Sequence, residues 1–234
     1  MGEVFLAVDT ELERFVALKV LPADVSDDRE RIRRFAQEAK AASALNHPNI
    51  LTIHEIGLVK GTRFIVSEFI KGKTLRDKLK SESLNLSETI EIAIQITSAL
   101  HTAHSSQIIH RDIKPENIMI REDNLVKVLD FGLAKLTVQS PEEFNSASPT
   151  YEQVKTKSGM VLGTVGYMSP EQARGKTVDH RTDIFSLGVV LYEILTRMPP
   201  FTGETNSDVI AAILMKEPQN PRSINFPRSK LTRF

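Results

Sequence analysis

Two short polar segments constrain this chain more than any other part of its sequence. The first reads His-Arg-Asp-Ile-Lys-Pro-Glu-Asn over residues 110–117, and the second reads Asp-Phe-Gly over residues 130–132. The first offers a carboxylate that can accept a proton, a lysine that can neutralise phosphate and an amide that can bind a cation. The second offers another carboxylate for a cation, beside a glycine that allows a tight turn. Transfer of a phosphoryl group needs this combination of base, positive charge and metal.

A purely structural interpretation of the same stretch explains only its flanks. Residues 118–120 and 125–129 are apolar or alternate with polar residues, as the short strands of a hairpin do. That interpretation leaves unexplained why His, Arg, Asp, Lys and Asn crowd the segment that precedes the hairpin. The chemical interpretation is therefore preferred, and it needs support from the rest of the chain.

The composition argues against several classes of partner and site. The chain has 234 residues, 41% of them hydrophobic, which is enough for one or two packed cores. Lys plus Arg and Asp plus Glu both number 30, so no basic excess favours nucleic acid or an anionic membrane surface. Cysteine is absent, which excludes disulfides and thiolate metal sites and fits a reducing compartment.

No segment of the sequence has the pattern of a signal peptide or a membrane span. Glu3 and Asp9 lie where a signal peptide has an apolar run. The most apolar stretch, residues 184–195, is interrupted by Glu193 and is too short to cross a bilayer. We therefore expect a cytoplasmic location, and the sequence leaves open a membrane anchor or sensor segment on a longer parent chain.

The first 69 residues are rich in short β-type runs and contain one helix. The helix is expected over residues 26–45, where Ser26 can cap the first turn and Ala39 belongs to an apolar face at helical spacing. Pro48 then ends the helical pattern. Strands are expected over residues 3–8, 14–20, 50–56 and 63–69.

From residue 70 onward the pattern is mainly helical. Residues 70–74 contain Gly72 and few apolar side chains, so we expect them to join two parts of the molecule. The helix expected over 87–105 carries isoleucine on more than one face, which predicts that it is buried. Further helices are expected over 182–196 and 206–216.

In these motifs and their order the chain resembles the catalytic domain of eukaryotic-like (Hanks-type) protein Ser/Thr kinases. A lysine two residues after Asp112 is typical of the Ser/Thr branch, and Met168–Gly175 resembles the bacterial members. The resemblance implies an α+β, two-lobed fold, with a small β-rich N-lobe over 1–69 and a larger helical C-lobe over 70–234. It implies a protein substrate and no nucleic acid, and it is compatible with a dimer whose copies phosphorylate each other.

The same resemblance implies that ATP and Mg²⁺ are the cofactors. Asp112 would orient the substrate hydroxyl and accept its proton, while Lys114 would stabilise charge on the transferred phosphoryl group. Asn117 and Asp130 would hold Mg²⁺.

Lys19, in the run Val-Ala-Leu-Lys, would bind the α- and β-phosphates and pair with Glu38 of the first helix. The alternative for Lys19 is an ordinary solvent-facing strand lysine. Residues 67–70 would form the hinge beside adenine, or would simply be the end of a strand. The other contacts to ATP would come from Gly2, Val4, Ala17, Glu68, Ile70 and Met119.

Residues 130–171 correspond to the activation segment of the family. Its middle is long and polar, and Thr156 and Ser158 are the expected phosphorylation sites. Arg111 would bind the phosphate through charge-assisted hydrogen bonds. The alternative is a disordered linker whose Ser and Thr residues have no role.

Three further positions would support the site. Ser169 stands where the family has alanine in its Ala-Pro-Glu motif, and Glu171 would pair with an arginine beyond residue 234. Asp183 would brace the backbone of the His-Arg turn at 110–111, although a carboxylate at a helix start can also be a plain cap.

The resemblance is incomplete at both ends of the chain. Of the glycine-rich loop only Gly2 remains, and residues 230–234 look like the start of a further helix. We therefore expect the first strand and the last helices to be missing, which would weaken phosphate binding. The competing interpretations are a catalytically impaired interaction module and a phosphotransferase that acts on small molecules.

Overall fold

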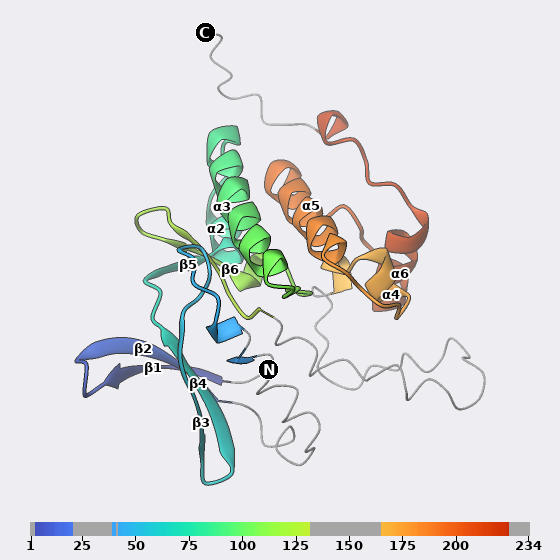
Figure 1. The fold of residues 1–234 in the computed structure, drawn as a ribbon. Helices are drawn as coiled ribbons and strands as arrows, with labels where there is room; N and C mark the ends of the chain where they lie inside the picture. Colours follow the sequence, from blue (N-terminus) through green and yellow to red (C-terminus); the bar gives the residue numbers. More distant parts are fainter. Residues whose placement is uncertain (1–2, 21–38, 41, 132–164, 225–234) are drawn as a thin grey trace, which may run out of the picture.

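The computed structural model describes residues 3–20, 39–40, 42–131 and 165–224. These residues form a four-stranded antiparallel sheet and a larger, mainly helical part that carries a three-stranded sheet (Figure 1). The two parts agree with a two-lobed α+β fold, and we refer to them as the N-lobe and the C-lobe.

The N-lobe sheet has the strand order β1-β2-β4-β3. Its β3–β4 hairpin turns through Lys60 and Gly61, which both have positive φ, as a two-residue type I′ turn requires. The strands are β1 (Glu3–Asp9), β2 (Arg14–Val20), β3 (Ile53–Val59) and β4 (Thr62–Glu68).

The strand expected over 50–56 is wrong at both ends, because β3 runs from Ile53 to Val59. Ile50 instead forms a parallel bridge to Val128 in the C-lobe, with hydrogen bonds from Leu51 N to Val128 O (3.0 Å) and from Val128 N to Asn49 O (2.8 Å). Ile50 is buried there. Pairing with a distant strand therefore overrides the local β-type pattern.

Only the end of the helix expected over 26–45 lies within the described residues. Residues 39–40 and 42–43 are helical, and a turn follows at residue 44. Ala39 is fully buried and packs with Ile65 of β4, so the apolar face of this helix end lies against the N-lobe sheet.

The segment expected to join the two parts contributes a strand to the C-lobe. β5 (Gly72–Thr74) pairs with β6 (Ile118–Arg121), which in turn pairs with β7 (Val126–Val128). A Cβ at Gly72 would lie 2.3 Å from the carbonyl oxygen of Ile120, so this close approach of two backbones requires glycine.

The C-lobe helices begin and end close to the expected positions. α3 (Leu86–Ser105) is capped by Asn85, whose side chain and that of Glu88 form a reciprocal capping box. The other helices are α2 (Leu75–Ser81), α4 (Pro170–Ala173), α5 (Arg181–Thr196) and α6 (Asn206–Met215), and short 3₁₀ turns lie at Pro115–Asn117, Val165–Tyr167 and Pro221–Ser223.

The expectation that α3 is buried on more than one face is wrong. Ile92 and Ile96 lie in the core, whereas Ile90 and Ile94 are 49% and 62% exposed. α3 packs on α5 and β7 with one face, so the isoleucines on its other face stay in solvent.

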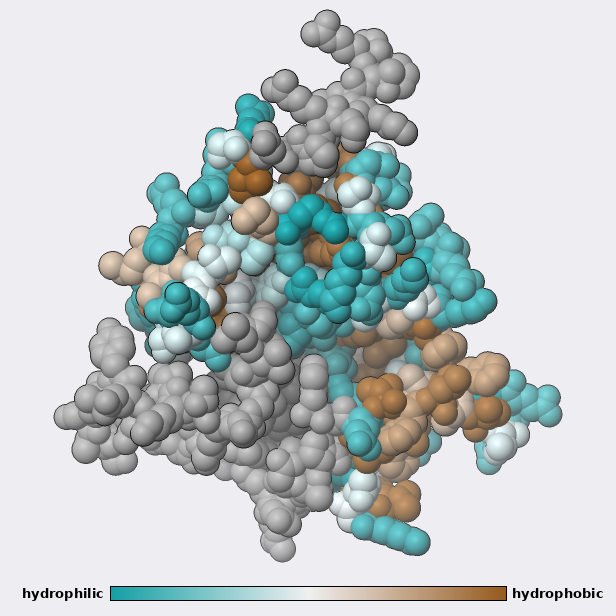
Figure 2. Space-filling model, turned by 180° about the vertical axis from the view of Figure 1, so that it is seen from behind, coloured by the Kyte–Doolittle hydropathy of each residue, from teal (hydrophilic) through white to brown (hydrophobic). Residues whose placement is uncertain are grey.

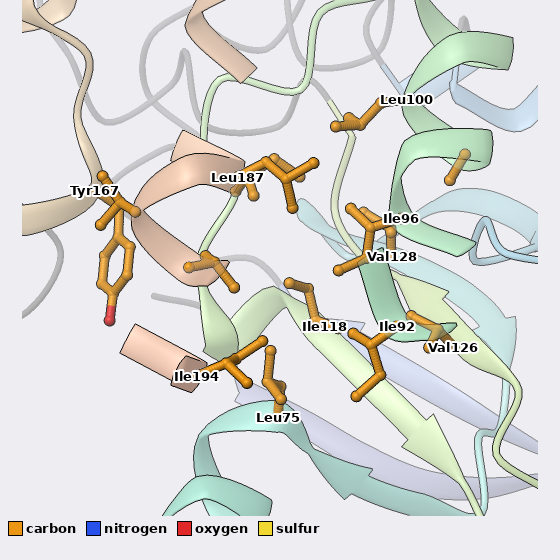
Figure 3. Close-up of a cluster of buried hydrophobic side chains, with 14 of the residues drawn as sticks. Leu75, Ile92, Ile96, Leu100, Ile118, Val126, Val128, Tyr167, Leu187 and Ile194 are labelled. Carbon is orange, nitrogen blue, oxygen red and sulfur yellow. The ribbon is translucent and has the colours of Figure 1, made fainter. Parts of the chain in front are cut away.

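The core of the molecule lies in the C-lobe. Figure 3 shows Ile92 and Ile96 of α3 facing Ile118 and Val128 of the small sheet, with Leu187 and Ile194 of α5 across the cluster. The N-lobe sheet instead exposes many apolar side chains, which gather on one part of the surface in Figure 2. In the part of the chain that the structure describes, no helix has the length and apolar character needed to span a membrane.

Candidate active site

Residues 110–117, which the resemblance predicts to be the catalytic loop and which we call by that name, lie between α3 and β6 and bring three polar side chains together. Asn117 donates from Nδ2 to both the carboxylate and the carbonyl oxygen of Asp112, each at 2.8 Å. Lys114 Nζ lies 2.8 Å from the same carboxylate oxygen, Oδ2. Lys114 and Asn117 are buried, so their contacts hold Asp112 in one orientation.

Asp130 lies beside this loop, directly after β7. The backbone N–H of Leu129 donates to the carbonyl of Asn117 at 2.9 Å, which ties the end of β7 to the catalytic loop. Asp130 has φ 57°, an uncommon conformation for a residue other than glycine. Its carboxylate accepts a hydrogen bond from Lys19 Nζ at 2.5 Å.

Lys19 therefore reaches from the N-lobe sheet to a C-lobe carboxylate. Its side chain is only 23% exposed, so the alternative of a solvent-facing strand lysine is wrong. The expected partner Glu38 lies outside the described residues. Lys19 and Asp130 line a partly open cleft together with Ile65, Ser67 and Phe131.

Two of the residues expected to pack on adenine, Val4 and Ala17, share one face of the N-lobe sheet. Val4 is opposite Lys19, and Ala17 is opposite Ser67, and directly opposed residues in antiparallel strands lie on the same face. Ser67 is buried at the cleft. Met119 lies in β6, where its neighbours Ile118 and Ile120 point into the C-lobe core, so Met119 points to the opposite face.

The side chain of Glu68, at the expected hinge, is held by the C-lobe. Its Oε1 accepts hydrogen bonds from Lys127 Nζ (2.6 Å) and from the backbone N–H of Thr52 (2.8 Å). Burial would raise the pKa of Glu68, but the hydrogen bonds from Lys127 and Thr52 outweigh it and hold that pKa below its ordinary value. Ile70, the other hinge residue, is buried.

Asp183, near the start of α5, binds the backbone of the catalytic loop. Its two carboxylate oxygens accept the backbone N–H groups of His110 (2.9 Å) and Arg111 (2.7 Å), the contact that the resemblance predicts. His104 contacts Oδ2 at 2.7 Å. The alternative of a plain helix cap is wrong, because the cap of α5 is His180 and the Asp183 carboxylate bonds to the loop.

Asp183 is fully buried, and its charge is compensated by these partners. Burial would raise its pKa, but the contacts from His104 and the loop amides outweigh that cost and keep the pKa below its ordinary value. His110, also buried, contacts Leu129 O through Nε2 at 2.7 Å and packs edge-on against Phe131. The Asp112 and Asp130 segments are thus connected through one histidine.

A second polar network, which sequence reasoning missed, lies beside the catalytic loop. Arg76 of α2 contacts Glu116 at 2.7 Å and Glu193 of α5 at 2.5 Å, and the hydroxyl of Tyr167 bonds to both Arg76 and Glu193. Burial and Glu193 raise the pKa of Tyr167, which therefore remains a neutral phenol. One sequence feature could have indicated this network: Glu193 is an acidic residue within an otherwise apolar helix.

Ser169, the departure from the family's alanine, has a local structural explanation. It is the N-cap of α4, and its side chain and that of Gln172 form a capping box. Its hydroxyl also contacts Thr182 Oγ1 at 2.5 Å. Glu171 lies in α4, whereas Gly2, Thr156 and Ser158 fall outside the described residues, and their roles stay predictions.

Comparison with known proteins agrees with this geometry. The protein kinase domain family matches residues 1–231. The chain is 41% identical to serine/threonine-protein kinase pkn3 of Myxococcus xanthus and 43% identical to PknB of Mycobacterium tuberculosis, each over 94% of this chain. It covers only 40% and 34% of the lengths of those two relatives.

The fold also matches a solved structure. The crystal structure of a single mutant of the Mycobacterium tuberculosis PknI kinase domain superposes with a TM-score of 0.69 at 24% identity, covering 96% of this chain and 76% of that one. At this identity the likeness concerns the fold alone. From its family match and its relatives, the chain belongs to the protein kinase family, within the bacterial Hanks-type Ser/Thr kinases.

Proposed function

We propose that this chain transfers the γ-phosphoryl group of ATP to serine or threonine hydroxyls of protein substrates, with Mg²⁺. The observation that carries the proposal is the arrangement around Asp112, whose carboxylate is held by Lys114 and Asn117 next to the Asp130 segment. A fixed carboxylate can orient a hydroxyl and accept its proton, and Lys114 Nζ supplies positive charge at the same point.

The residues present fit a magnesium ion. Asn117 uses its Nδ2 in hydrogen bonds to Asp112, which leaves its amide oxygen for a cation, and Asp130 offers a carboxylate. Mg²⁺ prefers oxygen ligands and is often bound by one or two protein groups together with phosphates. Bound there, it would neutralise phosphate charge, while Lys19 would bind phosphate oxygens from the N-lobe side.

Adenine would be bound by the hinge. The carbonyl of Glu68 and the N–H of Ile70 are the proposed hydrogen-bonding groups, with Val4, Ala17 and Met119 packing on the ring.

We also propose that phosphorylation at Thr156 or Ser158 regulates the enzyme through Arg111. Support comes from the Arg111 Nε, which is buried and has no hydrogen-bond partner among the described residues.

Asp112→Asn tests the proposal directly. Phosphoryl transfer from labelled ATP to a general protein substrate is expected to fall by about 10²–10⁴-fold, while Mg·ATP affinity stays near the wild-type value. Asp123→Asn is the matched control, because Asp123 lies in the exposed β6–β7 turn. Equal turnover in wild type and Asp112→Asn would remove Asp112 from the mechanism. Turnover absent even in the wild type would favour the interaction-module alternative.

A further inference from the structure

Arg111, which directly precedes Asp112, has a strained backbone that is held from two sides. Its φ is 67°, in the left-handed region that a residue other than glycine rarely adopts. Its N–H donates to Asp183 Oδ1 at 2.7 Å, and its carbonyl accepts from Gln172 Nε2 at 2.8 Å. Such a conformation persists only where the surroundings impose it, and here two side chains of the C-lobe do so.

Gln172 belongs to α4, the short helix that follows the activation segment. Its Oε1 accepts the backbone N–H of Ser169 at 2.9 Å and the hydroxyl of Thr182 at 3.0 Å. Because a backbone N–H can only donate, this contact assigns the oxygen of the amide to the cap and leaves its NH₂ group for Arg111 O. The two ends of one side chain therefore have separate partners: the oxygen completes the capping box, and the nitrogen holds the catalytic loop.

We propose that Gln172 is a positioning residue for the catalytic loop. Through the carbonyl of Arg111 it fixes the strained turn that orients Asp112, and through Ser169 it joins that turn to the end of the activation segment. This role deepens the function proposed above and rests on it. Gln172 forms no hydrogen bond within the described residues to Lys19, Lys114, Asn117 or Asp130, the residues assigned to the metal and to the phosphates of ATP, so we expect its effect on the phosphoryl-transfer step and not on ATP binding.

Two variants separate the two ends of the side chain. Gln172→Glu keeps an oxygen for the capping box but has no N–H for Arg111 O, and its second oxygen would face that carbonyl. We expect kcat with a protein substrate to fall roughly 10- to 100-fold, because the partly buried carbonyl of Arg111 loses its donor and the base is misplaced. The KM for ATP should stay close to wild type, and the melting temperature should fall by no more than it does in Ser169→Ala. Ser169→Ala removes the capping hydroxyl but leaves the amide of Gln172, so it should lower the melting temperature with little effect on kcat.

The control is Glu88→Gln, the reverse exchange at the equivalent position of the α3 capping box, remote from the site. It should leave kcat and melting temperature unchanged. The proposal is overturned if Gln172→Glu has wild-type kcat, or if its loss of kcat is matched by Ser169→Ala and follows the melting temperature. Absence of turnover in the wild-type chain would instead overturn the proposed function, and this inference with it.

Discussion

The two lobes supply their parts of the site in different ways. In the C-lobe, His110, Asn117 and Asp183 are buried, and each is held by hydrogen bonds to a neighbouring segment. In the N-lobe, Val4 is 62% exposed, and the buried cluster on the sheet among the described residues is small, with Ala39 and Ile65 and two partly buried isoleucines. The C-lobe therefore presents a pre-formed loop at residues 110–117, whereas the N-lobe presents the residues proposed to contact ATP on a more exposed sheet.

The largest loss of stability should come from removing the Asp183 carboxylate, which binds the backbone of the catalytic loop. Asp183→Ala leaves the buried backbone N–H of His110, the partly buried N–H of Arg111 and the side chain of His104 without their acceptor. We expect the free energy of unfolding to fall by about 3–5 kcal/mol. Denaturant unfolding measures this, with Asp123→Ala in the exposed β6–β7 turn as the control. A loss below about 1 kcal/mol in Asp183→Ala would show that the loop does not depend on Asp183.

The next largest effect should come from the contact that joins the lobes. Lys127→Met leaves Glu68 without its cation and should cost about 2 kcal/mol at neutral pH. The pKa of Glu68 is lowered in the folded protein, so its contribution to stability is present above the ordinary value of 4.5 and is lost as pH falls through the folded value.

The difference in unfolding free energy between Lys127→Met and wild type should therefore shrink below about pH 4.5. Unfolding curves at pH 7 and pH 4 measure this difference. A difference that stays constant over this range would show that the Glu68 charge is not what Lys127 stabilises.

The smallest effect should come from one exchange made in both sheets. Val128→Thr places a hydroxyl in the C-lobe core, where Val128 is fully buried, and should cost about 1 kcal/mol. Val59→Thr makes the same exchange at an exposed N-lobe position and should change stability by less than about 0.5 kcal/mol. Equal losses in thermal unfolding would contradict the difference in packing between the lobes.

The sequence predicted the elements whose pattern is local. β1, β2, β4 and α5 begin and end within one residue of the expected positions, because apolar periodicity and caps mark them. It placed β3 too early, because the pairing of Ile50 with Val128 depends on a strand almost eighty residues away. The sequence also could not show which isoleucines of α3 are buried against another helix or strand.

The same limit applies to the site. The residues within one motif, such as Asp112 and Asn117, could be read together because their spacing is fixed. Gln172 and Arg76 act on the catalytic loop from other helices, and only the packing of α4 and α2 brings them there. Neither has a spacing that connects it with residues 110–117, so sequence reasoning had no local pattern from which to find them.

The contrast between the lobes is tested most directly by amide hydrogen exchange of the chain without nucleotide. We predict that peptides covering residues 108–118 exchange slowly, through global unfolding, because the loop amides donate to buried groups. Peptides covering residues 3–8 should exchange much faster and become protected when Mg·ATP is added. Fast exchange in residues 108–118, equal to that of residues 3–8, would contradict the claim that the C-lobe presents a pre-formed catalytic loop.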